Sequence, residues 1–201
     1  MRTQYVHRRS SAACRAALVA ATLWMSGGGG ASAKAATSTC DLPDLSISAL
    51  ARINQLRAAG ADCRSGGTFA PAAALAWSAR LARAAERHAQ DMVAKNFISH
   101  TGSDGSTASV RIGATGYAWR LVGENVAVGH VDIDNVMAGW MARDGHCANL
   151  MDPGFAEVGL VCVSGTAASA HRSYWTMDLA RPTSNQTQPA ITPPPRQTSP
   201  S

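Results

Sequence analysis

The fold of this chain is decided by the stretch Leu121-Val122-Gly123-Glu124-Asn125-Val126-Ala127-Val128. Its apolar run predicts an extended segment over residues 121–128, and that segment carries Glu124 within it. Two histidines stand in comparable polar settings, one in Ser99-His100 and one in Gly145-His146. Small, turn-forming residues flank each of the three. Two histidines and a carboxylate of this kind can converge on one cleft, so His100, Glu124 and His146 form the candidate site.

Helical patterns dominate the chain before this stretch. Residues 45–59 carry apolar side chains at helical spacing, and Gly60 is suited to end that helix. A longer helix is predicted over residues 72–95, and a short one over residues 107–114. The apolar stripe of the long helix consists of Trp77, Leu81, Ala84, Ala85, His88 and Met92.

His88 is the one histidine on that apolar stripe. A lone histidine in such a position has a hydrogen-bonded packing role more often than a ligand role. We therefore place His88 outside the candidate site.

A third substantial helix and two strands are predicted after the central stretch. Asp132 or Asp134 would cap the helix, and residues 143–145 break the pattern just before His146. Residues 158–163 form an apolar run and residues 174–179 alternate, as strands do. Helices followed by strands indicate an α+β fold, whose strands should pair antiparallel.

The N-terminal residues 1–36 are typical of a secretory signal peptide. A basic start with Arg8 and Arg9 precedes a short apolar run and then small residues suited to cleavage. The run is too short to span a bilayer, and no later segment is long and apolar enough, so no transmembrane segment is expected in the mature chain. The alternative is an N-terminal membrane anchor. A secreted or periplasmic location follows from the signal-peptide interpretation.

The distribution of charge argues against a nucleic-acid partner. The chain carries 18 Lys and Arg against 13 Asp and Glu. Five of the basic residues lie in residues 1–36, which contain no acidic residue, so 18 − 5 leaves 13 basic against 13 acidic in the rest. Phosphate binding needs a clustered excess of Lys and Arg, and the predicted domain has no net excess.

A single domain is expected over residues 40–181. Residues 182–201 consist largely of Pro, Ser, Thr and Gln and contain no apolar pattern that could be buried. We interpret them as a disordered tail.

Four cysteines remain once Cys14 is removed with the leader: Cys40, Cys63, Cys147 and Cys162. In an exported chain this number suggests two disulfides, for which three pairings exist. We favour Cys40 with Cys63 and Cys147 with Cys162, because each pair is close in sequence. Each bridge would stabilise the fold by roughly 3 kcal/mol. A zinc site of four thiolates is the competing idea, but no Cys-x-x-Cys spacing supports it.

Seven short motifs occur in the order found in one known family. They are Leu75-Ala76-Trp77, Phe97-Ile98-Ser99-His100, Gly123-Glu124-Asn125-Val126-Ala127, Gly139-Trp140-Met141, Gly145-His146-Cys147-Ala148-Asn149-Leu150-Met151, Phe155-Ala156-Glu157-Val158-Gly159 and Tyr174-Trp175. The chain thus resembles the CAP superfamily of cysteine-rich secretory, antigen 5 and pathogenesis-related proteins, in its small bacterial secreted branch. The resemblance covers residues 47–180.

The resemblance implies an α-β-α sandwich with a short, mainly antiparallel sheet between helices. It also implies that His100, Glu124 and His146 line a central cleft, where the two histidines can bind zinc or another divalent cation. Many eukaryotic members carry a second glutamate after the tryptophan of the Gly139-Trp140 motif. This chain has Met141-Ala142-Arg143 there, so the second acid is missing.

Three interpretations of the site remain open. The first is a binding module, expected to be a monomer, that takes a lipid, sterol, glycan or extracellular protein. The second is a metal-dependent, protease-like hydrolase with His100 and His146 as metal ligands and Glu124 as catalytic general base. The third is a structural or signalling module without chemistry. Asn125 and Asn149 fit a supporting role in each, because their amides can tie loops together.

Overall fold

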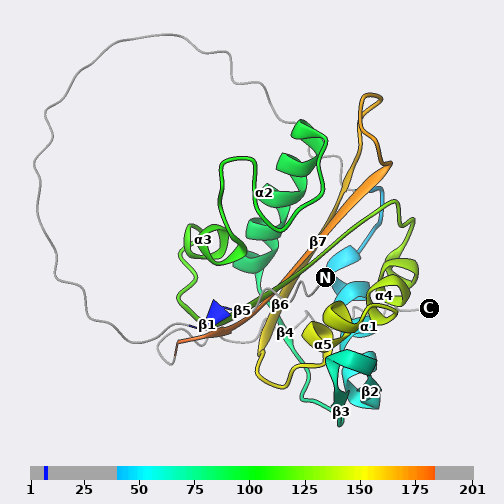
Figure 1. The fold of residues 1–201 in the computed structure, drawn as a ribbon, viewed down its shortest axis with the longest axis vertical. Helices are drawn as coiled ribbons and strands as arrows, with labels where there is room; N and C mark the ends of the chain where they lie inside the picture. Colours follow the sequence, from blue (N-terminus) through cyan, green and yellow to red (C-terminus); the bar gives the residue numbers. More distant parts are fainter. Residues whose placement is uncertain (1–6, 9–39, 184–201) are drawn as a thin grey trace, which may run out of the picture.

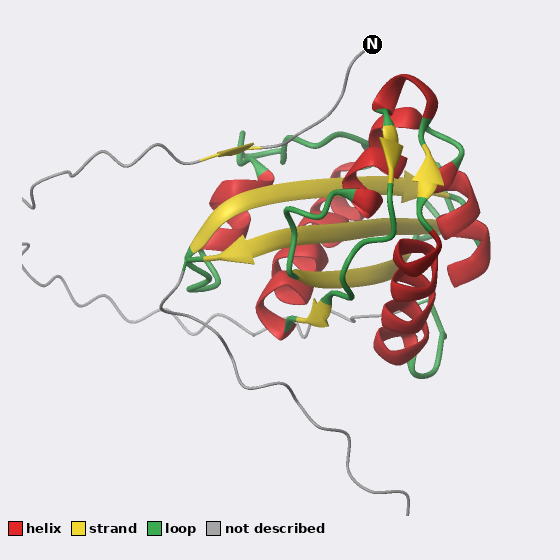
Figure 2. Cartoon of the chain, turned by 90° about the horizontal axis from the view of Figure 1, so that it is seen from below, coloured by secondary structure: helices red, strands yellow, loops and turns green. Residues whose placement is uncertain are grey.

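The central sheet lies between two layers of helices in the computed structural model, which describes residues 7–8 and 40–183. Its five strands follow the order β1-β5-β7-β6-β4. They are β1 (His7–Arg8), β5 (Trp119–Val128), β7 (Ser173–Pro182), β6 (Glu157–Ser164) and β4 (Ala76–Trp77). The long strands β5, β7 and β6 pair antiparallel, as predicted, whereas β4 pairs parallel with β6. Figure 2 shows the three long strands side by side.

Helices cover both faces of this sheet, so the α-β-α sandwich is confirmed (Figure 1). One face packs against α2 (Ala79–Lys95) and α3 (Ala108–Gly113). The other face packs against α1 (Leu45–Ala59), α4 (Ile133–Met141) and α5 (Asp144–Met151). A small excursion after α1 contains β2 (Ala61–Asp62), the 3-10 helix η1 (Arg64–Gly66) and β3 (Thr68–Phe69).

Local sequence signals account for the ends of three helices. Helix α1 covers the predicted residues 45–59 and ends at Gly60, whose φ of 71° suits a residue without a side chain. Asn96 ends α2 in the left-handed region. Of the two proposed caps of α4, Asp132 is the one in place, since its carboxylate accepts a hydrogen bond of 2.7 Å from the Asn135 N–H.

The long helix α2 begins later than predicted. Residues 72–78 were expected to be helical, but Ala76 and Trp77 form β4. The Ala76 N–H donates to the Ala156 carbonyl at 3.0 Å, and the Ser78 N–H donates to the Val158 carbonyl at 2.8 Å. Pairing with β6 therefore outweighs the helix propensity of the alanine-rich stretch, which is worth only tenths of a kcal/mol per residue.

A helix forms where the sequence pattern suggested a break. Helix α5 begins at Asp144 and includes Gly145, so His146 lies in its first turn and not in a loop. The pattern failed here because eight residues, one of them glycine, carry too little periodicity to reveal a short helix. Tertiary packing supplies the stability instead, with five buried residues at its C-terminal end, Cys147, Ala148, Asn149, Leu150 and Met151.

The main core lies between the sheet and the α1, α4 and α5 layer. The alternation predicted over residues 174–179 is confirmed, since Trp175, Met177 and Leu179 of β7 share one face and are buried in this core. The opposite face approaches α2 closely at Gly159 of β6. A Cβ atom at Gly159 would lie 2.0 Å from the backbone nitrogen of Ala82, so only glycine allows this contact.

The disulfide assignment from sequence is wrong. Cys40 pairs with Cys162 and Cys63 pairs with Cys147, across 122 and 84 residues respectively. Closeness in sequence misled the prediction because Cys147 lies on the helix α5, whereas Cys162 lies on β6 within the sheet. The two bridges instead anchor both flanks of α1 to the second half of the domain.

Several expectations concern residues outside the described part of the chain. The signal peptide over residues 1–36 falls there apart from His7 and Arg8, whose backbones pair with Leu121 and Val122 of β5. Of the tail over residues 182–201, only residues 182 and 183 are described. Among the described residues, none of the helices is both long and apolar enough to cross a membrane.

We predict that peptide mapping without reduction will recover Cys40 linked to Cys162 and Cys63 linked to Cys147. Replacing the first pair in a Cys40→Ser, Cys162→Ser variant should lower the free energy of unfolding by about 4 kcal/mol, because a long loop in the unfolded chain is no longer closed. Urea denaturation measures this loss. A peptide joining Cys40 to Cys63 would contradict the assignment.

Candidate functional site

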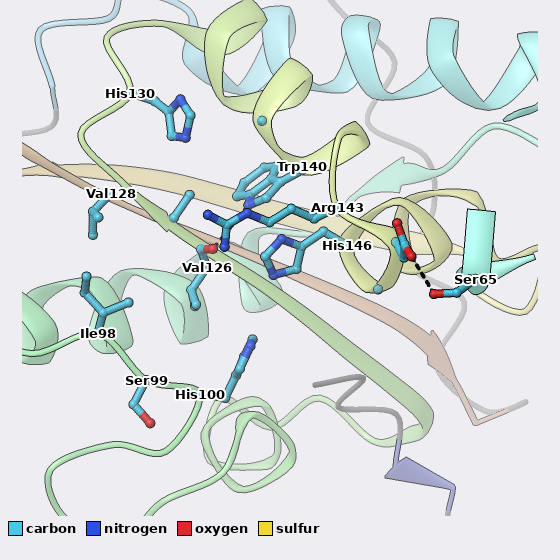
Figure 3. A pocket seen from close by; sticks show the side chains of 15 residues that line it. Ser65, Ile98, Ser99, His100, Val126, Val128, His130, Trp140, Arg143 and His146 are labelled. Carbon is cyan, nitrogen blue, oxygen red and sulfur yellow. Dashed lines mark hydrogen bonds between the residues drawn. The ribbon is translucent and has the colours of Figure 1, made fainter. Parts of the chain in front are cut away.

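A cavity of about 1120 Å³ opens across the end of β5. Val126, Ala127 and Val128 of that strand form part of its wall. His100 approaches from the loop after α2, and His146 approaches from α5 on the opposite layer (Figure 3). The two helical layers of the sandwich thus meet over one strand, and each contributes one of the predicted histidines.

The two histidine rings face each other across this cavity. Their centroids lie 6.5 Å apart with an interplanar angle of 60°. Nδ1 of His100 donates a hydrogen bond of 2.8 Å to Oε1 of Glu124. A neutral His100 ring therefore carries its lone pair at Nε2. Orientation of a histidine by a carboxylate behind it is a common device in sites that use the other ring nitrogen.

Glu124 lies beneath His100 and is not part of the cavity lining. Its side chain is fully buried, and Arg111 of α3 donates a hydrogen bond of 2.5 Å to the second carboxylate oxygen, Oε2. Hydrogen bonding from His100 and the charge of Arg111 lower the pKa of Glu124, although burial alone would raise it. Both oxygens of an ionised Glu124 are therefore engaged, Oε1 by His100 and Oε2 by Arg111.

Arg111 also ties the His100 loop to α3. Its guanidinium donates to the carbonyl of His100 at 3.2 Å and to the carbonyl of Ser106 at 2.7 Å. One buried cation thus fixes the backbone and, through Glu124, the ring of the same histidine.

His146 is held on α5 in its neutral form. Burial lowers its pKa to about 4, with smaller electrostatic contributions from the neighbouring His100 and Arg143. An imidazole that stays neutral at pH 7 can accept or donate a hydrogen bond within the cavity.

The two predicted supporting asparagines link α5 to β5. Asn149 donates to the Glu124 carbonyl at 3.1 Å and to the Asn125 side-chain oxygen at 2.9 Å. Asn125 in turn donates to the His146 carbonyl at 3.0 Å. This chain of hydrogen bonds sets the distance between the strand that carries Glu124 and the helix that carries His146.

Asp178 of β7 is the residue directly opposite Glu124. The Glu124 carbonyl accepts a hydrogen bond from Asn149, so this carbonyl points away from β7. Glu124 and Asp178 therefore form a pair without backbone hydrogen bonds between them. In such pairs the opposite side chains come closest. Asp178 is completely buried, and in the described chain no N–H or hydroxyl group donates to its oxygens. Burial and the charge of Glu124 raise the pKa of Asp178 well above its usual range, so Asp178 keeps its proton and can donate it to Glu124.

His88 has the packing role expected of it. It is buried on α2, and its Nε2 donates a hydrogen bond of 2.7 Å to the carbonyl of Ser99. Burial lowers the pKa of His88, so the ring is neutral and supports the His100 loop from below.

Sequence reasoning missed Arg111, Asp178 and Arg143. A signal existed for Asp178, since it is a lone carboxyl directly between the apolar residues Met177 and Leu179. Arg111 gave none, because an arginine in a short predicted helix is normally exposed. Arg143, which lines the cavity, appeared in the sequence only as the residue that stands where an acid was expected.

The imidazoles of His100 and His146 are the two side chains facing each other in the cavity that could bind a divalent cation. In the described part of the chain, no group of three His, Cys, Asp or Glu side chains is arranged to hold a metal ion. Catalytic zinc sites generally use three protein ligands and structural ones four, so this set does not fit a resident zinc ion. Zinc binding by His100 and His146 stays a prediction.

We predict that Asp178→Asn stabilises the protein increasingly as pH rises. The unfolded chain ionises Asp178 near pH 3.9, whereas the folded chain keeps it protonated, so wild-type stability falls above that pH. Asparagine donates to Glu124 without this loss. The free energy of unfolding would be measured with urea at pH 4 and pH 7. The difference between variant and wild type should grow in favour of the variant by at least about 1 kcal/mol between these two pH values. An equal shift at both pH values, or the same gain in the exposed control Asp134→Asn, would contradict the role of Asp178.

Comparisons with known proteins agree with this architecture. The 26% identical structure of an extracellular protein containing an SCP domain from Bacillus anthracis matches with a TM-score of 0.51, over 67% of this chain and 41% of that one. A cysteine-rich secretory protein from Staphylococcus aureus, SAV1118, shares the fold at 16% identity, with a TM-score of 0.51 over 70% of this chain and 39% of that one.

Curated relatives match over shorter stretches. The uncharacterized protein YkwD of Bacillus subtilis is 29% identical over 80 residues, which are 40% of this chain and 31% of that protein. The chain therefore covers about a third of that relative and about two fifths of the two solved structures. The family model described as "CAP: Cysteine-rich secretory protein family" matches residues 50–179, which hold both histidines and Glu124, and the chain belongs to this family.

Proposed function

We propose that this protein is an exported CAP domain that binds a small ligand in the cavity at the end of β5. Support for export comes from the two disulfides, the signal-peptide pattern and the relative described as an extracellular protein. The binding role is carried by one observation, the cavity on which His100 and His146 face each other. Its volume of about 1120 Å³ is slightly larger than that of a usual small-molecule site.

The pre-formed geometry of the two histidines favours binding. The ring of His100 is oriented by Glu124 and Arg111, so it does not have to be ordered when a ligand arrives, and the backbone of His146 is held by Asn125. Imidazole nitrogens can form hydrogen bonds with the polar groups of a lipid, sterol or glycan, which are the ligand classes that the family resemblance suggests. The protein acts in this role as a monomer.

Hydrolysis is the second candidate, favoured by the His100–Glu124 pair, which resembles the oriented base of many hydrolases. The arrangement gives it less support than binding. Glu124 itself lies below the cavity with both oxygens engaged, which leaves it poorly placed as the general base. The nearby Ser99 uses its Oγ to accept the Thr101 N–H at 3.0 Å.

We predict that His100→Ala and His146→Ala each weaken ligand binding at least about tenfold, since each removes a polar group from the cavity wall. Purified protein would be screened against lipids, sterols and glycans by native mass spectrometry, and dissociation constants measured for the best ligand. His171→Ala, outside the cavity, is the matched control and should bind like wild type.

The same proteins would be titrated with zinc and tested for turnover of ester, peptide and glycoside substrates. Turnover that disappears in His100→Ala would replace the binding role by hydrolysis. Unchanged ligand binding in both variants, with a lower melting temperature, would assign the histidines a purely structural role. Stoichiometric zinc uptake by wild type that is lost in the His100→Ala, His146→Ala double variant would support a metal site at these two histidines.

A further inference from the structure

The charged side chains that line the cavity do not balance one another. Asp144 is the acidic residue among them. Its carboxylate already accepts hydrogen bonds from Ser65 and, at 3.1 Å, from Arg64. Glu124 lies below the lining and is matched by Arg111. The negative charges near the cavity are thus neutralised by groups outside it.

Arg143 is the positive charge that remains. It lines the cavity from the residue just before α5, and among the described residues it forms neither an ion pair nor a side-chain hydrogen bond. Figure 3 shows its side chain reaching over the cavity, with the guanidinium between Trp140 and His146 in this view. Its charge contributes to the lowered pKa of His146, which agrees with this closeness.

Apolar side chains form the adjoining wall. Val126 and Val128 of β5 and the ring of Trp140 line the cavity together with Ile98. Ile98 is 48% exposed, a large value for an isoleucine, and it lies on the opposite side of β5 from Arg143 (Figure 3). A ligand that bridges the cavity would therefore meet a cation at one end and apolar surface at the other.

From this arrangement we infer that the cavity takes an organic monocarboxylate, with its carboxylate on Arg143 beside His146 and its apolar body along Val126 and Ile98. The inference rests on the binding function proposed above. A guanidinium presents two parallel N–H donors, which match a planar carboxylate. One permanent, unpaired charge fits a monoanion better than a phosphate dianion, and the neutral ring of His146 can donate a further hydrogen bond.

The test compares an acid with its uncharged analogue. Isothermal titration calorimetry on the exported protein would measure binding of 4-phenylbutyrate and of 4-phenylbutyramide, which share the apolar body and differ in charge. The acid should bind at least about tenfold more tightly, because a charge-assisted pair replaces a neutral contact. Higher salt should weaken binding of the acid and leave the amide unaffected. N-acetyl-Leu-Phe and its C-terminal amide form a second pair, which distinguishes a peptide terminus from a free acid as the source of the carboxylate.

Variants at Arg143 separate charge from cavity shape. Arg143→Gln should remove the preference for the acid while the amide binds as before, and Arg143→Glu should reverse the preference. Arg143 is exposed, so neither change should lower the melting temperature appreciably. Arg120→Gln, an exposed arginine outside the cavity, is the matched control.

Arg143→Glu also places a carboxylate beside two imidazoles, so its zinc affinity should rise above that of wild type. Equal wild-type affinity for acid and amide, or a preference that survives Arg143→Gln, would overturn the inference and leave the binding function standing. Failure of wild type to bind either pair would overturn it as well. Binding of both compounds that persists in the His100→Ala, His146→Ala double variant would instead overturn the proposed function.

Discussion

The buried carboxylate of Glu124 is the constraint on which the site depends. An ionised side chain in the centre of a sheet is costly unless each oxygen finds a charged or strongly polar donor. Arg111 and His100 meet that requirement from one helical layer, and Asp178 meets it from the next strand by keeping a proton. The groups that stabilise the charge of Glu124 therefore fix the positions of α3, the His100 loop and β7 relative to one another. The hydrogen bonds that stabilise the buried charge of Glu124 therefore also hold the ring of His100 in place.

The second histidine is positioned by different means. His146 lies on a short helix, α5, that is held to the sheet by side-chain amides and to Cys63, just before η1, by a disulfide. Trp140 of α4 adds a further tie, since its indole N–H donates to the Val126 carbonyl at the free side of β5. The cavity exists because β5 has, along these residues, a partner strand on one side and loops and helices on the other. The part of β5 that has no partner strand on this side, and would otherwise invite pairing, thereby forms a wall of the cavity.

The sequence was sufficient for those parts of the structure that follow from local periodicity and from motif order. Helix α1, the strands β5, β6 and β7, the layer arrangement and the meeting of His100 with Glu124 were all predictable in this way. Three features were not, because each depends on contacts between distant segments. The start of α2 was decided by pairing with β6, the disulfides by the positions of α5 and β6, and the proton on Asp178 by a neighbour 54 residues away in the chain. Arg143 shows the same limit, because only the structure places this exposed arginine beside the cavity.

The bridge between Cys63 and Cys147 has a consequence for where the site can exist. Cys147 directly follows His146, so oxidation that fixes the cysteine on the segment after α1 also fixes its neighbour. Before oxidation, α5 is held to that segment only by non-covalent contacts such as those of Asp144 with Ser65 and Arg64. Thiols stay reduced in most cytosols and become oxidised outside them. The export proposed above would therefore act as a maturation step for the cavity, because oxidation turns a loosely tethered second histidine into a covalently anchored one.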